Sequence, residues 1–278
     1  MKTKEELVKV FEQTLEDIQV GGYQKSDGTW QEFPSATRGM RFYPTLPAIK
    51  TEIKRYPGQK VYVENIDTFQ KAQVMGPGTA VLNMASFIRP GGGVEGGSRA
   101  QEEDLCRRSN LVASLYGYSP DKYNLIPGLR EPGKYSYPIP TYGGIYTKTV
   151  MVYKTAGSYS CMDNPFTCSV ISVPAVKRPE LTKDGMMCEK AVKVMKGKIR
   201  AILRIALMNG HSKLVLGAFG CGAYSCPNRH VALLFKEVLQ EKEFDHSFEE
   251  ICFAIIEDKN SLKNNKEGNL KPFKEIFG

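Results

Sequence analysis

The sequence predicts an α/β fold, a sandwich built around a largely buried sheet. Short apolar runs alternate along the chain with segments of helical periodicity, and this alternation is typical of α/β domains. The runs at 79–85 and 213–219 are apolar over most of their length, which indicates strands that are buried on both faces. A chain of 278 residues is long enough to bury a sizeable core around such a sheet.

The first predicted element is a helix that begins after Thr3. Thr3 and Glu6 have the spacing of a capping box, in which each side chain binds the other residue's N–H. Four apolar residues then recur on one face: Leu7, Phe11, Leu15 and Ile18. Residues 20–58 are rich in Gly, Pro and aromatic residues and show little periodicity. We expect this segment to wrap over a neighbouring surface.

Beyond residue 58, strands and helices alternate. Apolar runs bounded by turn residues predict strands at 60–66, 79–85, 149–156, 168–174, 213–219 and 250–256. Apolar residues at helical spacing predict helices at 67–75, 101–116, 187–208 and 228–240. Residues 117–147 are full of Pro, Gly and Tyr, and a loop of this length in a compact domain is more often functional than idle. No repeat or linker divides the chain.

Composition narrows the function classes. An apolar content of 41% and a charged content of 24% are ordinary for a soluble protein, and no apolar run approaches the ~20 residues of a membrane-spanning helix. The first residues lack the apolar centre of a secretion signal, so we expect a cytoplasmic protein without membrane contact. The net charge of +8 suits an anionic partner such as phosphate, although a modest excess is also common on a solvated surface.

The sequence gives no sign of a metal or a cofactor. The seven cysteines are scattered without a CxxC pair, and we expect most of them to be buried reduced thiols. No HExxH motif occurs, and His211, His230 and His246 lie far apart in sequence, where a structural role is expected.

Two glycine-rich loops follow two predicted buried strands. The first loop contains Gly91, Gly92, Gly93 and Val94, and the second contains Gly220, Cys221, Gly222, Ala223 and Tyr224. In open α/β sheets, ligands lie at the carboxyl ends of the strands, and glycine lets backbone N–H groups converge on an anion. Two such loops could hold a diphosphate from opposite sides, or they could simply be tight turns.

A dinucleotide-binding reading of the first loop is less favoured. Gly91, Gly93 and Gly96 spell GxGxxG, but Pro90 interrupts the junction between strand and turn. No clear strand ending in an acid follows at the required distance. A nicotinamide or flavin enzyme therefore ranks well below a protein that holds a diphosphate between its two glycine loops.

A pair of acids follows the first loop. Gln101, Glu102 and Glu103 would begin a helix, in which neighbouring side chains point about 100° apart. One acid could then hold a substrate hydroxyl while the other reaches the bond to be cut. Burial and a nearby diphosphate both raise the pKa of a carboxyl, as a general acid requires near neutral pH.

The stretch GGG-VEGGSRA-QEE resembles the signature of poly(ADP-ribose) glycohydrolases, a triple glycine followed after six to eight residues by QEE. The chain is most similar to the bacterial-type branch, whose catalytic domain is a macrodomain. Other stretches, among them AVLNMAS and LVLGAFGCGAY, occur in the order of that family, so that the resemblance covers roughly residues 5 to 278. It implies a three-layer α/β/α macrodomain-like sandwich with a mixed central sheet. Residues 1–58 would form an N-terminal helical extension packed on a catalytic core of residues 59–278.

The resemblance also implies roles for individual residues. Gly91 to Val94 would lie along the diphosphate and distal ribose of ADP-ribose, and Gly220 to Ala223 would hold the diphosphate from the other side, with Tyr224 over the distal ribose. Glu103 resembles the catalytic acid, Glu102 the residue that orients the ribose, and Gln101 a support of the loop. Asn83 would either contact a ribose or satisfy the backbone at its strand end, and Asn65 is a candidate for contact with the adenine.

Three departures from the family leave the fine contacts open. Ser86 stands where general macrodomains have asparagine, and Arg89 stands where bacterial-type relatives often have asparagine. The second loop continues as Tyr-Ser-Cys-Pro where relatives often show Gly-Asn. The acids themselves are unchanged.

The expected function is hydrolysis of the ribose–ribose O-glycosidic bonds of poly(ADP-ribose), with release of ADP-ribose. Glu103 would protonate the leaving oxygen and then activate water, and no cofactor would take part. Three alternatives stay open: removal of single ADP-ribose units from protein or DNA, a module that binds ADP-ribose without cutting it, and the lower-ranked nucleotide-dependent oxidoreductase. The expected partner is poly(ADP-ribose) or an ADP-ribosylated macromolecule, and the chain is expected to act as a monomer.

Overall fold

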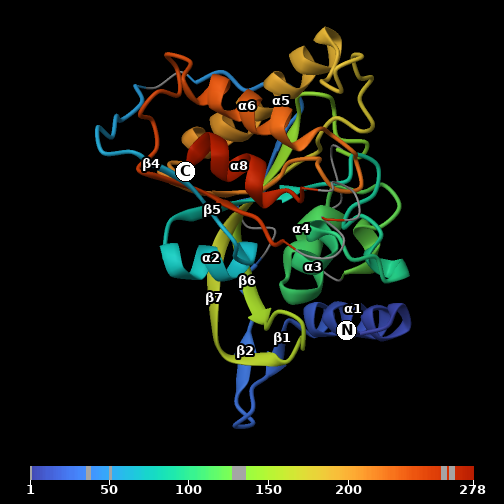
Figure 1. Ribbon diagram of the computed structural model, residues 1–278. Coiled ribbons are helices and arrows are strands. Elements are labelled where there is room, and N and C mark those ends of the chain that lie inside the picture. Colours follow the sequence, from blue (N-terminus) through green and yellow to red (C-terminus); the bar gives the residue numbers. More distant parts are fainter. Residues whose placement is uncertain (1, 36–38, 50–51, 127–135, 258–261, 263–266) are drawn as a thin grey trace.

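The computed structural model describes residues 2–35, 39–49, 52–126, 136–257, 262 and 267–278. Within them, a mixed sheet lies between two layers of helices, which confirms the predicted three-layer α/β/α sandwich (Figure 1). The strands are β1 (Gly22–Gln24), β2 (Trp30–Glu32), β3 (Arg41–Tyr43), β4 (Lys60–Glu64), β5 (Thr79–Met84), β6 (Gly144–Lys154), β7 (Cys161–Val173), β8 (Lys213–Leu216) and β9 (Glu250–Ala254). The helices are α1 (Lys4–Val20), α2 (Thr68–Met75), α3 (Gln101–Arg108), α4 (Leu111–Tyr116), α5 (Glu189–Met208), α6 (Asn228–Leu239) and α8 (Leu270–Phe277). Single 3₁₀ turns, η1 (Val94–Gly96) and η2 (Tyr123–Leu125), interrupt the loops.

The main sheet has seven strands in the order β3-β6-β7-β5-β8-β9-β4. Strands β7, β5, β8, β9 and β4 run parallel to one another, whereas β6 is antiparallel to both of its neighbours. Because β5 and β8 are parallel neighbours, their carboxyl ends lie side by side at one edge of the sheet. The two glycine loops begin at that edge.

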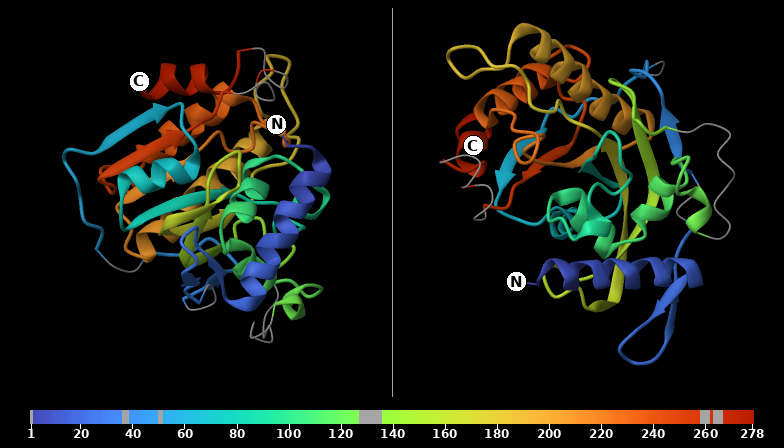
Figure 2. Two further views of the ribbon diagram at one scale, coloured as in Figure 1. Left: turned by 90° about the horizontal axis from the view of Figure 1, so that it is seen from below. Right: turned by 90° about the vertical axis from the view of Figure 1, so that its right-hand side faces the viewer.

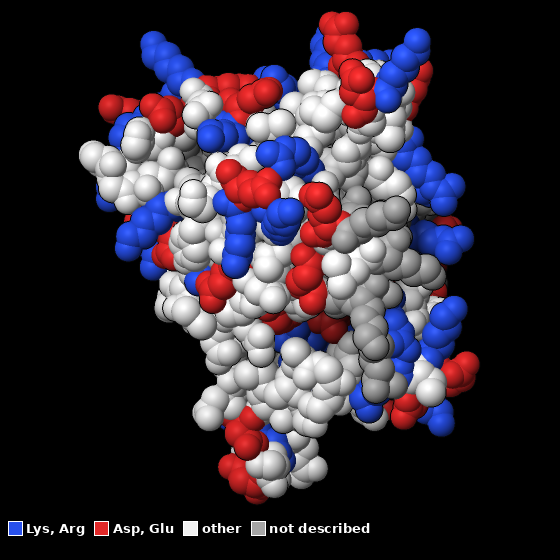
Figure 3. Space-filling model, viewed as in Figure 1, with Lys and Arg blue, Asp and Glu red and all other residues white. Residues whose placement is uncertain are grey.

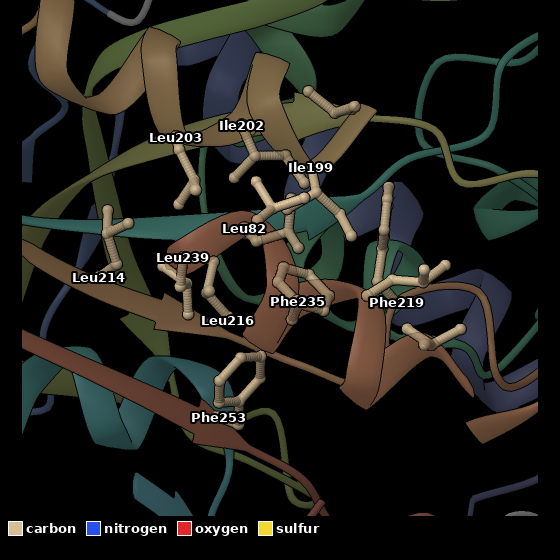
Figure 4. Close-up of a cluster of buried hydrophobic side chains, with 14 of the residues drawn as sticks. Leu82, Ile199, Ile202, Leu203, Leu214, Leu216, Phe219, Phe235, Leu239 and Phe253 are labelled. Atoms are coloured by element: carbon tan, nitrogen blue, oxygen red, sulfur yellow. The ribbon is translucent and has the colours of Figure 1, made fainter. Parts of the chain in front are cut away.

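The two helical layers cover opposite faces of the sheet. Helices α5, α6 and α8 lie on one face, and α2, α3 and α4 lie on the other, with α1 beyond them (Figures 1 and 2). Figure 4 shows the packing on the first face, where side chains of α5 and α6 meet those of β5, β8 and β9. Most of these side chains are less than 2% exposed, so the sheet has little freedom to shift under the loops that it carries.

The N-terminal helix begins as predicted. Thr3 and Glu6 form the capping box, and Leu7, Phe11 and Ile18 are buried, while Leu15 is partly buried. The buried face of α1 also carries two polar residues, Thr14 and Asp17, which the apolar pattern does not reveal. Both contact the end of β6, where this long strand extends past the rest of the sheet (Figure 1).

Several predicted elements differ in detail. The helix expected at 101–116 is divided into α3 and α4, because Asn110 exchanges hydrogen bonds with Met151 of β6 and Ser109 pairs with Val152. The segment 20–58 is less irregular than expected, since it contains a β1–β2 hairpin and the edge strand β3. The loop expected at 117–147 ends earlier, where β6 begins, and its residues 127–135 lie outside the described residues. Helix α8 was not predicted.

The division of the chain into residues 1–58 and 59–278 stays a prediction. None of the helices in the described part of the chain is long and apolar enough to cross a membrane. On the face seen in Figure 3, basic and acidic side chains are interspersed. The positive net charge is therefore not gathered into one uniform basic area on that face.

Candidate active site

The two glycine loops meet at the carboxyl edge of the sheet. The first loop follows β5 and the second follows β8, which is the neighbour of β5. Tyr224 of the second loop reaches across to the first, where its phenol oxygen interacts with the Phe87 N–H and the Ser86 hydroxyl. Burial raises the pKa of Tyr224, and these two donors partly oppose that effect. The predicted convergence of the loops is thus present in the fold.

The acid pair lies in the first turn of α3, directly after the first loop. Glu102 and Glu103 are 3% and 7% exposed, so neither carboxyl points into bulk solvent. Acids in this turn are favoured by the partial positive charge at the helix N-terminus. Helix α3 ends with two buried arginines, Arg107 and Arg108, whose contacts fix its position.

Glu102 is bound by three groups of the surrounding strands and loop. Its Oε2 accepts a hydrogen bond of 2.7 Å from the Ser86 N–H, and its Oε1 lies 3.3 Å from Asn83 Nδ2. The Gly91 N–H also interacts with this carboxyl. Burial raises the pKa of Glu102 to about 8, and the neighbouring Glu103 adds to the rise. Near neutral pH, Glu102 therefore holds a proton that an exposed glutamate would have lost.

Glu103 keeps one carboxylate oxygen without a partner. Its Oε1 accepts a hydrogen bond of 2.8 Å from the Gly93 N–H. Its Oε2 is buried and, among the described residues, has no hydrogen-bond partner. Because buried polar atoms in native proteins are almost always paired, this oxygen is available to a substrate.

The glycines of the first loop are required by the acids. Gly91 and Gly92 have left-handed backbone conformations, with φ of +75° and +62°. A Cβ atom on Gly92 would lie 2.5 Å from Glu103 Oε1 and 3.0 Å from Glu102 Oε2. The N–H groups of Gly91 and Gly93 interact with the two carboxyls, and contact of Gly91, Gly92 and Gly93 with a bound anion stays a prediction. The loop therefore packs its backbone directly against the acid pair.

Val94 is also occupied within the protein. Its side chain is buried in the core on the α3 and α4 side of the sheet. Its N–H donates to Gly91 O, and its carbonyl accepts from Gly97 N–H and Arg107 Nη2. The predicted contact of Val94 with a ligand stays a prediction.

Gln101 joins the start of α3 to the end of β5. Its side-chain Nε2 donates to Leu82 O at 2.8 Å, and its Oε1 accepts from Met84 N–H at 2.8 Å. One residue of a neighbouring parallel strand would make the same pair of hydrogen bonds. The amide of Gln101 thus extends the sheet by one position and fixes Glu102 and Glu103 relative to β5.

Asn83 lies at the end of β5 beneath the acids and is fully buried. Its Nδ2 donates to Ser172 Oγ at 3.0 Å as well as to Glu102. Its Oδ1 has no partner among the described residues. Asn83 is therefore not used to satisfy the backbone of its strand end, and contact with a ribose stays a prediction.

The second loop offers main-chain donors. Within the described residues, the N–H groups of Gly222, Ala223 and Tyr224 donate no hydrogen bond. Gly220 has a φ of +79°, and a Cβ there would lie 2.7 Å from Ala175 Cβ. The Cys221 side chain is buried in the core, so that this residue could meet a ligand only through its backbone. This arrangement suits an anion better than the first loop does.

Sequence reasoning missed one polar side chain near the acids. Tyr137 is buried in the loop before β6; burial raises the pKa of its phenol, and Glu102 raises it further once it is ionised. Its segment was marked as functional because of its length and composition, but nothing in the local pattern distinguishes Tyr137 from the other tyrosines of the loop. Asn65, the candidate for adenine contact, is exposed, and its Oδ1 accepts from Glu257 N–H.

Two surface cavities lie away from the acids. One of about 610 Å³ is bounded by residues of the 48–55 segment together with Arg204 and Glu243. The other, of about 270 Å³, lies at the amino end of β5, opposite the site. Neither is lined by a predicted site residue. Among the described residues, no group of three or more His, Cys, Asp or Glu is placed to hold a metal ion.

The raised pKa of Glu102 predicts a pH-dependent stability difference. An unfolded glutamate loses its proton at about 4.3, whereas folded Glu102 keeps it to about 8. Between these values the folded state binds more protons, so that the wild type loses stability as the pH rises. The amide in Glu102→Gln does not titrate. The difference in melting temperature, variant minus wild type, should therefore increase from pH 4.5 to 8 and then level off. Differential scanning fluorimetry across pH checks this, with the exposed Glu12→Gln as control. A difference that is constant over this range would contradict the burial assigned to Glu102.

Comparison with known proteins identifies the family. The model of the family described as microbial-type PARG, catalytic domain, matches residues 11–155, just over half of the chain. The chain is similar to the poly(ADP-ribose) glycohydrolase of Thermomonospora curvata bound to the inhibitor ADP-HPD, with a TM-score of 0.78 and 26% identity over 98% of this chain and 100% of that chain. It is also similar to the poly(ADP-ribose) glycohydrolase of Deinococcus radiodurans in complex with ADP-ribose, with a TM-score of 0.66 and 24% identity over 88% of this chain and 98% of that chain.

The second of these likenesses shows a shared fold alone. No curated protein matches the sequence at a significant level. The family match includes the first glycine loop and the acid pair, and the likeness to the Thermomonospora enzyme extends over nearly the whole chain. The chain therefore belongs to the family of microbial-type poly(ADP-ribose) glycohydrolases.

Proposed function

We propose that this chain hydrolyses the ribose–ribose O-glycosidic bonds of poly(ADP-ribose) and releases ADP-ribose, with Glu103 as general acid and base. Its membership of the family supports the activity. The observation that carries the role of Glu103 is its Oε2 atom, which is buried and has no hydrogen-bond partner among the described residues. The oxygens of Glu102, in contrast, already accept hydrogen bonds from Ser86 and Asn83.

The reaction begins with proton transfer to the leaving oxygen. Protonated Glu103 donates from its free oxygen to the glycosidic oxygen, the bond to the anomeric carbon breaks, and an oxocarbenium-like ribose forms. The negative diphosphate of the substrate favours the protonated form of a carboxyl beside it and stabilises the cationic ribose. The resulting carboxylate then takes a proton from water, whose oxygen attacks the anomeric carbon and completes the hydrolysis.

Glu102 and the two loops position the substrate. Glu102 is rigidly held by Asn83, Ser86 and Gly91, and it binds hydroxyls of the distal ribose. The unengaged N–H groups of Gly222, Ala223 and Tyr224 bind the diphosphate. In this assignment the first loop presents the acids and the second loop supplies the anion site.

Parallel assays on three substrates test the function. The protein is incubated with poly(ADP-ribose), mono-ADP-ribosylated protein and ADP-ribosylated DNA, and free ADP-ribose is measured. We expect release from the polymer. Release from only the protein or the DNA would show that the substrate is not the polymer. Binding of ADP-ribose without any release would show that the chain is a binding module and not an enzyme. We further propose that the protein acts as a monomer. Light scattering under assay conditions measures its molar mass and checks this.

The close approach of Gly92 to the acids predicts the effect of a single methyl group. In Gly92→Ala, the Cβ would lie 2.5 Å from Glu103 Oε1, and the left-handed backbone adds strain. The Glu103 carboxyl must move to make room for this methyl group. Because displacing a catalytic group in this way lowers the rate by about 100-fold, we expect kcat/KM on poly(ADP-ribose) to fall roughly 100-fold.

Gly96→Ala is the matched control. Gly96 lies in the same loop, is exposed, and has no atom within 4 Å of an added Cβ. This variant should keep wild-type kcat/KM. If the two variants lose activity equally, general loosening of the loop, and not contact with Glu103, explains the effect.

A further inference from the structure

The described part of the loop before β6 lies against the active site. Ile139 N–H donates to Phe87 O at 2.8 Å, which attaches the loop to the chain just after Ser86. Ser86 N–H in turn binds Glu102. Tyr137 lies two residues before Ile139, and Pro138 stands between them. The backbone contacts thus bring Tyr137 into the surroundings of the acid pair.

The Tyr137 side chain is buried without a partner in the described part of the chain. It is 8% exposed, and its phenol oxygen has no hydrogen-bond partner among the described residues. Other tyrosines buried in this protein do have partners: Tyr23 donates to Met162 O, Tyr116 to Glu95 and Tyr153 to Asp17. A buried phenol that lacks a partner destabilises the fold, so that its presence calls for a bound group that pairs with it.

Three buried atoms without partners among the described residues belong to groups that interact with or adjoin Glu102. Asn83, whose Oδ1 has no partner, binds Glu102 through its Nδ2, and Glu103, whose Oε2 has none, is the next residue of the helix. Tyr137 is the third, because ionised Glu102 has a larger effect on its phenol than any other charged group. Burial raises the pKa of Tyr137, and Glu102 raises it further once it is ionised, so that the phenol stays protonated and is a donor.

The donor and acceptors complement a sugar hydroxyl group. Asn83 Oδ1 can accept a hydrogen bond, the Tyr137 phenol can donate one, and Glu103 Oε2 can accept one or, when protonated, donate one. A ribose ring carries neighbouring hydroxyls, each of which both donates and accepts. The three atoms therefore fit a ribose better than they fit a phosphate, which only accepts, or a cation.

We propose that Tyr137 is a substrate-binding residue whose phenol donates a hydrogen bond to a hydroxyl of the distal ribose, the sugar whose anomeric carbon faces Glu103. The proposal rests on the proposed function for the identity of that sugar. The proposal adds Tyr137 to the site, a residue that lies in the loop before β6 and in neither glycine loop.

Tyr137→Phe tests the proposal by removing one oxygen atom. Calorimetric titration with ADP-ribose should show a roughly tenfold weaker affinity, the cost of leaving one sugar hydroxyl unpaired. The kcat/KM on poly(ADP-ribose) should fall by at least the same factor. The melting temperature of the free protein should not fall, because the phenol makes no hydrogen bond to a described residue.

Tyr153→Phe is the matched control. This phenol is also buried, but it donates to Asp17 at 2.7 Å. Its removal should lower the melting temperature and leave the affinity for ADP-ribose unchanged. The opposite responses of the two variants separate a ligand contact from a structural one.

The outcomes distinguish this proposal from the proposed function. If the wild type cleaves the polymer and Tyr137→Phe binds ADP-ribose and cleaves as well as the wild type, the inference about Tyr137 is wrong. A lower melting temperature with unchanged affinity would likewise overturn it. If the wild type binds ADP-ribose without cleaving the polymer and Tyr137→Phe binds more weakly, the proposed function fails while the ribose contact stands. If the wild type does not bind ADP-ribose, both fail.

Discussion

Replacing Glu103 with Gln should abolish the hydrolysis of poly(ADP-ribose), with a loss in kcat of about 1,000-fold or more, while ADP-ribose affinity changes little. General acid and base catalysis by one side chain contributes up to about 10⁴-fold, and an amide can neither donate the required proton nor accept one from water. The amide oxygen can still accept the hydrogen bond from Gly93 N–H. Single-turnover rates and calorimetric affinity, measured on the same preparation, check both halves of this expectation.

Glu189→Gln is a suitable control for that experiment. Glu189 also lies in the first turn of a helix, α5, but it is exposed and makes no contact with the site. Its rate should equal that of the wild type. If Glu103→Gln retains more than a tenth of the wild-type rate, the catalytic acid is another group, and Glu102, with its retained proton, becomes the first candidate.

The second large effect concerns the stability of the fold. Asp17→Ala should lower the free energy of unfolding by about 3–5 kcal/mol, because it leaves a buried ammonium group without its counter-charge. Lys154 is 2% exposed, and its Nζ lies 3.1 Å from Asp17 Oδ2 and 2.9 Å from Thr14 Oγ1. Asp17 also accepts a hydrogen bond from the Tyr153 phenol, which would lose its partner. Urea denaturation at neutral pH measures the loss.

The pH dependence and two further variants check the cause. Burial lowers the pKa of Lys154, and Asp17 opposes this effect, so that its removal should lower the pKa further. The unfolded lysine then binds more protons than the folded one, and the deficit of Asp17→Ala should shrink as the pH rises towards about 10. Adding Lys154→Met should restore much of the stability, whereas Glu16→Ala, on the exposed side of α1, should change it by less than about 0.5 kcal/mol. A deficit that is independent of pH and of Lys154 would show that lost packing is the cause.

Strands β5, β8 and β9 could be predicted because each is a continuous apolar run followed by turn residues. Their order in the sheet could not, since parallel pairing depends on contacts between distant parts of the chain. Strand β3 was missed because three residues at an edge give no usable period, and α8 was missed because it is short and its burial depends on β9, where Phe277 stacks on Phe253. Helix α3 ends early for a similar reason, since the hydrogen bonds of Asn110 with β6 replace those of a continuing helix.

The candidate site was predicted where its chemistry is local in sequence. Two glycine loops and two adjacent acids are visible as motifs, and the structure brings them together. The hydrogen-bond acceptor of each backbone N–H group cannot be read from the sequence. The sequence therefore predicts a ligand as the acceptor for Gly91 and Gly93, whereas in the structure their N–H groups interact with the two acids. Tyr137 could not be selected among its neighbours, because its environment is created by β5, α3 and the second loop, which are far from it in sequence.

The buried guanidinium of Arg107 has a consequence for how this protein could be trimmed or recombined. It donates to Leu7 O in the N-terminal helix and to Val94 O and Ser98 O in the loop that precedes the acids. One cation thus secures an appended helix and the catalytic segment at the same time. Without α1, the Arg107 guanidinium would lose its Leu7 acceptor and leave an unpaired N–H group under the catalytic segment. In this family member, the accessory helix is a structural part of the catalytic apparatus and cannot be exchanged as an independent module.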